Sequence, residues 1–128
     1  MSVIRIGTRG SKLALAQTNR VVAALAENGI ETELIHIGHQ AIRGCIACGS
    51  CYKNGKCVFD DAVNEVAEKF RDADGLVVAS PVYYASANAT LIALLDRLFY
   101  SCNFNTTMKV GASIAVARRG GCSSTFDQ

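Results

Sequence analysis

The apolar residues of this chain fall into short β-branched runs that alternate with longer stretches of helical spacing. Residues 3–7 form the first such run and predict a strand, and a helical pattern begins at Lys12. This helix is expected to end at Asn28 and Gly29, a pair that suits a left-handed C-terminal cap. Residues 32–37 predict the second strand.

The same alternation continues through the second half of the chain. Residues 75–80 are a continuous apolar run ended by Pro81, which predicts a central parallel strand, and residues 110–117 predict the fourth strand. Residues 38–60 follow no period, and their glycines and cysteines indicate a functional loop or a short irregular excursion. Two helical stripes are expected, one after a cap at Asp60 or Asp61 and one after Asn88: Val63, Val66, Ala67 and Phe70, and then Leu91, Leu94, Leu95 and Leu98. A last helix would be capped by Ser123, Ser124 and Thr125.

Strands that alternate with helices require crossover connections, which are right-handed between parallel strands. We therefore predict a single α/β domain over residues 1–128, with a doubly wound parallel sheet in the strand order 2-1-3-4. The sequence ends before a fifth strand, so the outer edge of the sheet is expected to be open or paired with another subunit in a homodimer. Ligands of such sheets bind at the carboxyl ends of the strands.

Composition narrows the set of partners. The 13 basic and 11 acidic side chains are spread along the chain, so no broad basic surface for nucleic acid is expected. The first residues lack the apolar core of a secretory signal, and the most apolar later stretch, residues 89–95, is too short to span a membrane. We expect a cytoplasmic protein that binds neither nucleic acid nor membranes.

Six cysteines without a secretory signal favour reduced thiols or metal ligands over a disulfide framework. Four of them have the spacing C-x2-C-x2-C-x5-C, which brings thiolates close enough in sequence to surround an iron-sulfur cubane: Cys45, Cys48, Cys51 and Cys57. Zinc and four reduced thiols in a partly buried loop are the alternatives. Cys102 and Cys122 are expected to be unpaired packing residues, and His36 and His39 are assigned no role.

Three loops are expected to meet at the carboxyl edge of the sheet, where they could surround a phosphorylated ring cofactor. The first would hold a phosphate through amides, hydroxyls and charge: Thr8, Arg9, Gly10, Ser11 and Lys12. The second offers a fixed turn and two aromatic rings beside a flat isoalloxazine: Pro81, Val82, Tyr83, Tyr84 and Asn88. The third combines two cations with residues that allow close backbone approach: Arg118, Arg119, Gly120 and Gly121. The alternatives are a capped helix with solvated cations, tyrosines that only plug the sheet edge, and two solvated arginines.

Several of these motifs together resemble one family. Residues 44–57, 80–88, 95–97 and 117–121 are similar, in order and spacing, to the flavodoxin-like reductases that bind flavin mononucleotide (FMN), which include the iron-sulfur flavoproteins. The resemblance covers about residues 36–128. It implies a flavodoxin-like fold, bound FMN, hydride transfer from NAD(P)H, a [4Fe-4S] centre that exchanges electrons with the flavin, and a dimer with the flavin near the subunit interface.

The opening of the chain resembles a different family. The segment of about residues 3–35, from 5–17 through 33–35, closely resembles the start of porphobilinogen deaminase, which has a periplasmic-binding-protein-like fold. In that family the residues matching Arg9 and Ser11 contact carboxylates of the dipyrromethane cofactor, whereas the reductases open with a Gly-Ser-Pro-Arg type of phosphate loop. The sequence holds no further deaminase domain and no cysteine in the cofactor-tethering context, so deaminase activity is not expected. We hypothesise an engineered chimera of two α/β scaffolds, joined at about residues 35–38.

The main expectation from the sequence is therefore a chimeric flavodoxin-like scaffold with weakened or lost cofactor binding and no native catalytic activity. Two alternatives remain open. A working oxidoreductase with FMN and an iron-sulfur cluster would be a yellow-brown protein. A binding module for small anions or tetrapyrrole precursors would use Arg9, Ser11 and Lys12, and its ligand would raise the melting temperature.

Overall fold

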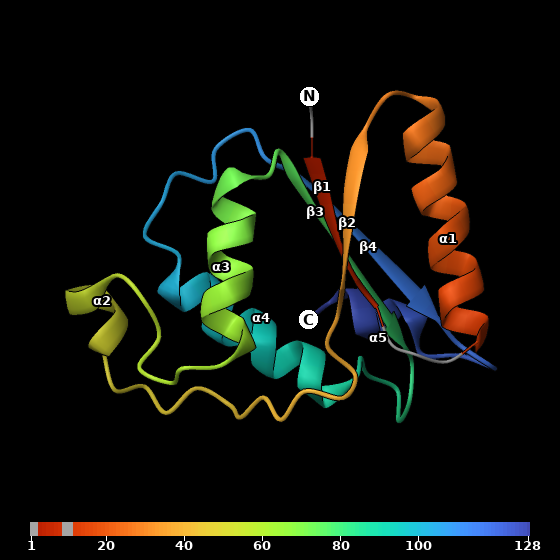
Figure 1. Ribbon diagram of the computed structural model, residues 1–128. Coiled ribbons are helices and arrows are strands. Elements are labelled where there is room, and N and C mark those ends of the chain that lie inside the picture. Colours follow the sequence, from red (N-terminus) through yellow and green to blue (C-terminus); the bar gives the residue numbers. More distant parts are fainter. Residues whose placement is uncertain (1–2, 9–11) are drawn as a thin grey trace.

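The computed structural model describes residues 3–8 and 12–128. Four strands of this part form one parallel sheet in the order β2-β1-β3-β4, which confirms the predicted order. Thr8 aligns with His36, and Pro81 aligns with Val116, so the strands end along one edge (Figure 1). The strands are β1 (Val3–Thr8), β2 (Glu31–His36), β3 (Gly75–Pro81) and β4 (Val110–Val116).

The helices lie on both faces of this sheet. Figure 1 shows α3 and α4 on one face and α1 on the other, as a doubly wound sheet requires. No helix of the described ranges is long and apolar enough to cross a membrane. The helices are α1 (Lys12–Glu27), α2 (Ser50–Asn54), α3 (Ala62–Asp72), α4 (Ala89–Ser101) and α5 (Cys122–Phe126).

The helix ends follow from local chemistry. Gly29 has a φ of 72°, and the amide of Ile30 donates to the carbonyl of Leu25 over 3.0 Å, which confirms the left-handed cap after α1. Asp61, rather than Asp60, caps α3, because its side chain accepts from the Val63 amide at 3.1 Å. These ends fix where the loops of the site begin.

The core lies between the sheet and the helices α3 and α4. Val63 and Leu98 are fully buried, and Phe70 is 5% exposed, so the two predicted helical stripes are confirmed as the buried faces. Strand β3 is flanked by β1 and β4, which confirms that it is a central strand. The members of the buried cluster are Ile37, Val63, Val66, Phe70, Leu91, Leu94 and Leu98.

Three expectations about element bounds were wrong. Residues 38–60 contain helix α2, which is too short to show a period and begins after Gly49, a residue in the left-handed region. Ser123, Ser124 and Thr125 lie inside α5, whose cap is Gly121. Pro81 is the last residue of β3 instead of the residue after it. Because no pair of the sheet follows it, its missing amide interrupts no further hydrogen bonds between β3 and β4.

Candidate functional site

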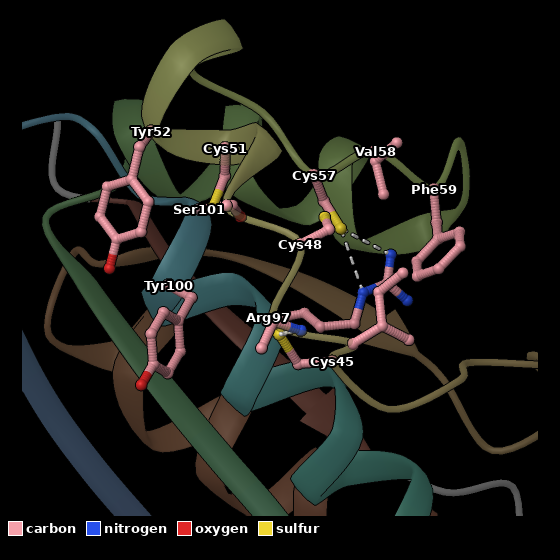
Figure 2. A pocket seen from close by; sticks show the side chains of 13 residues that line it. Cys45, Cys48, Cys51, Tyr52, Cys57, Val58, Phe59, Arg97, Tyr100 and Ser101 are labelled. Carbon is pink, nitrogen blue, oxygen red and sulfur yellow. Dashed lines mark hydrogen bonds between the residues drawn. The ribbon is translucent and has the colours of Figure 1, made fainter.

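The four closely spaced cysteines line one cavity of about 120 Å³ between the 45–59 segment and α4 (Figure 2). Cys45 and Cys48 are exposed, whereas Cys51 and Cys57 are half-buried. Helix α2 carries Cys51 as its second residue and therefore turns this part of the segment back toward α4. The fold thus gathers the complete predicted cysteine set around one space.

A buried arginine lies beside this cavity. Arg97, on α4, is 1% exposed, and its guanidinium donates to the Cys57 sulfur from Nε at 3.3 Å and from Nη2 at 3.2 Å. The same guanidinium forms a two-pronged ion pair with Asp61, with N–O distances of 2.7 and 2.8 Å. Its remaining bond, from Nη1, goes to the Arg43 carbonyl at 3.1 Å. Arg97 therefore ties the start, the end and the following helix of the cysteine segment together.

The charge of the buried Arg97 is neutralised by Asp61. Burial acts to raise the pKa of Asp61, but the hydrogen bonds from Arg97 and the Val63 amide, with the guanidinium charge, hold that pKa below its ordinary 3.8. Burial alone would lower the pKa of Arg97, yet hydrogen bonds and charge from Asp61 and Cys57 raise it above its usual value. Both groups are ionised at neutral pH.

A second side chain holds the backbone of the last cysteine in the motif. Asn64, in the first turn of α3, accepts from the Cys57 amide at 2.9 Å and donates to the Cys57 carbonyl at 3.1 Å. Its amide also donates to the Phe59 carbonyl at 3.0 Å. Cys57 is therefore fixed through its backbone by Asn64 and through its sulfur by Arg97.

Four thiols around one space form a donor set that fits an iron-sulfur cubane. In the described residues no three cysteine, histidine or acidic side chains stand close enough together to hold one metal ion. A cubane needs each thiolate on a different iron, so its ligands surround a space instead of meeting at a point. N–H groups also donate to two of the sulfurs, from Arg97 to Cys57 and from Ala47 to Cys45 at 3.4 Å, a feature that tunes such clusters.

The two remaining cysteines lie apart from this cavity. Cys102 is half-buried at the end of α4, and burial raises the pKa of its thiol to about 11. Cys122 is a free, half-buried thiol at the start of α5. Cys102 packs against the buried cluster, as expected for a packing residue.

At the carboxyl edge of the sheet, two of the three predicted loops touch. Gly121 has a φ of 97°, and a Cβ there would lie 2.9 Å from Val82 Cγ1 and 3.1 Å from Ala85 Cα. Ser124 Oγ donates to the Ala85 carbonyl at 2.7 Å. The glycine at 121 is therefore required by close approach of the two loops.

Within these loops the predicted residues have different surroundings. Tyr84 is 98% exposed and Tyr83 is 53% exposed, so neither side chain is part of the core. Asn88 caps α4 by accepting from the Thr90 amide at 2.9 Å, which gives it a structural task. Pro81 and Val82 are half-buried at the end of β3, while Arg118, Arg119 and Gly120 are exposed.

The first predicted loop is described only at its ends. Thr8 ends β1 and the exposed Lys12 begins α1, whereas Arg9, Gly10 and Ser11 lie outside the described residues. His36 ends β2 beside Thr8, and its Nε2 is buried with no hydrogen-bond partner among the residues that the structure describes. This nitrogen lies at the carboxyl edge of the sheet, where ligands of doubly wound sheets bind, and no pattern in the sequence marks it.

The model of the NADPH-dependent FMN reductase family matches residues 7–128. This chain belongs to that family. An iron-sulfur flavoprotein of Methanocaldococcus jannaschii is 38% identical over 96% of the chain and 67% of the relative's length. An iron-sulfur flavoprotein from Methanosarcina thermophila is 43% identical over 78% of the chain. The match spans about half of that relative's length, 54%.

Solved structures support the fold. The crystal structure of RosB has a TM-score of 0.75 at 18% identity, covering 99% of this chain and 56% of that one. An NAD(P)H:quinone oxidoreductase from Methanothermobacter marburgensis has a TM-score of 0.69 at 16% identity, covering 94% and 68%. The flavodoxin-like fold expected from the resemblance is thereby confirmed.

The comparisons also correct the interpretation of the N-terminal segment. The family model runs without interruption through residues 35–38, where the hypothesis placed a junction, and includes most of the part assigned to porphobilinogen deaminase. Nothing in them supports a deaminase segment, a chimera or a loss of activity.

Proposed function

We propose that this protein is an FMN-dependent oxidoreductase that carries a [4Fe-4S] cluster on Cys45, Cys48, Cys51 and Cys57. The observation that carries the proposal is the gathering of all four cysteines around one cavity, in a chain that belongs to a flavin reductase family. Relatives of 38% and 43% identity that are described as iron-sulfur flavoproteins support it.

The cluster would be held by the four thiolates of the cavity. When bound, such a cluster accepts and passes on single electrons. Cys57 would be the most constrained ligand, because Asn64 fixes its backbone and Arg97 contacts its sulfur. The apolar side chains of Ile46 and Val58 also line the cavity and would keep water from part of the cluster surface.

FMN would bind at the carboxyl edge of the sheet and supply hydride and single-electron chemistry there. Tyr83 and Tyr84, with their exposed rings, would lie beside the isoalloxazine, and NAD(P)H would be the hydride donor. His36 Nε2 is suited to donate a hydrogen bond to the flavin or its phosphate. The phosphate and ring contacts would come from Thr8, Arg9, Gly10, Ser11 and Lys12, from Pro81, Val82 and Asn88, and from Arg118, Arg119, Gly120 and Gly121.

Anaerobic purification tests both cofactors. We expect about four iron and four sulfide per chain after reconstitution, a broad visible absorption, and saturable quenching of FMN fluorescence. C51S should lose the iron, whereas C122S, at a cysteine outside the cavity, should keep it. Protein that takes up zinc but no iron would refute the cluster, and protein that leaves FMN fluorescence unchanged would refute the flavin site.

A further inference from the structure

The guanidinium of Arg97 has an unusual set of partners for a buried cation. Its five N–H bonds are all used, and two of them end on the sulfur of Cys57. Asp61 accepts two more, and the Arg43 carbonyl accepts the fifth. An uncharged side chain could fill this space without a counterion, so filling the space does not by itself explain why a charged residue is buried here.

The positive charge of Arg97 is only weakly screened at the cavity. Arg97 is 1% exposed and lines the cavity with the four cysteines, so water screens its charge little. The ring of Phe59 lies 5.0 Å from its guanidinium carbon and covers it on one side. The other charges at hand are Asp61, bound to the same guanidinium, and Arg43, whose guanidinium lies 4.4 Å from the centre of the Phe59 ring.

We propose that Arg97 is a positioning residue that sets the reduction potential of the cluster, by donating two hydrogen bonds to Cys57 and placing a cation beside it. This rests on the proposed function. One-electron reduction adds a negative charge to the cluster, and a nearby cation together with N–H bonds to a ligand sulfur stabilises that charge. Arg97 therefore raises the potential, and the carboxylate of Asp61 partly opposes it.

A purely structural role for Arg97 predicts something different. In that case Arg97 would hold the 43–61 segment in place, and substitutions would change stability and cluster content together without a consistent sign in the potential. The electrostatic role predicts opposite shifts when the cation and the anion of the same pair are removed. The pair thus supplies its own internal control.

The experiment is a dithionite titration of the reconstituted full chain, followed by the visible spectrum and by electron paramagnetic resonance of the reduced cluster. R97Q should move the potential to more negative values, and D61N should move it to more positive values. R97K keeps the charge and should restore most of the wild-type potential. R71Q removes an exposed arginine near the far end of α3 and should leave the potential unchanged.

A second measurement covers variants that fold poorly. Circular dichroism and iron content should match those of wild type for every variant whose potential is compared. If R97Q does not fold, D61N and R97K still carry the test. Potentials of R97Q and D61N that shift in the same direction, or that match R71Q, would overturn the inference alone. Wild-type protein that takes up no iron would overturn it together with the proposed cluster.

Discussion

The side-chain amide of Asn64 offers a direct test of how the cysteine segment is held. Replacing Asn64 with alanine removes three hydrogen bonds, two to the backbone of Cys57 and one to the carbonyl of Phe59. At about 1 kcal/mol net for each bond, the sum is about 3 kcal/mol. Asn64 is half-buried, so water can reach part of the freed backbone, and we expect N64A to lose about 2 kcal/mol.

The assay is urea unfolding of the reduced, cluster-free chain followed by circular dichroism. A loss of about 2 kcal/mol corresponds to a decrease of about 1 M in the urea midpoint. The matched control is N54A, because Asn54 is exposed and makes one bond, to Ser50 Oγ at 2.9 Å, so its effect should stay within about 0.5 kcal/mol. Equal midpoints for N64A and N54A would refute the idea that Asn64 anchors the segment.

Three further predictions concern the pair, the loops and the thiols. Because the folded-state pKa of Asp61 is lowered, its contribution to stability is complete above about pH 4 and is lost as the pH falls through the folded value; D61N should show a flatter acid limb in unfolding measured between pH 2 and 7, and parallel curves would contradict this. G121A should lose about 1 to 3 kcal/mol of unfolding free energy and bind FMN more weakly, because Gly121 has a positive φ and an added Cβ would lie 2.9 Å from Val82 Cγ1. G120A is the control in thermal unfolding, because a Cβ there would meet open space. Equal losses in the two variants would contradict the loop contact. At pH 8, iodoacetamide should modify the exposed thiols of the cavity well before Cys102, whose pKa of about 11 keeps it protonated; early labelling of Cys102 in a mass-spectrometric time course would show that burial does not protect it.

Much of the fold could be predicted because its signals are local. The alternating apolar runs and helical stripes predicted the four strands, their order and the three longer helices. Helix α2 was missed, since five residues are too few for a stripe to appear. The chimera hypothesis came from the resemblance of the opening residues to a second family, and the single family model that matches residues 7–128 corrects it.

The sequence by itself determined the chemistry that is available: four closely spaced thiols, two adjacent tyrosines and a glycine pair after a strand. Only the tertiary structure decided which groups act on them. Arg97 reaches Cys57 across 40 residues and Asp61 across 36, and no periodicity in the sequence marks such pairs. The physical reason is that a buried charge must find its partners wherever packing brings them, and packing is fixed by the whole sheet and its helices rather than by any one segment.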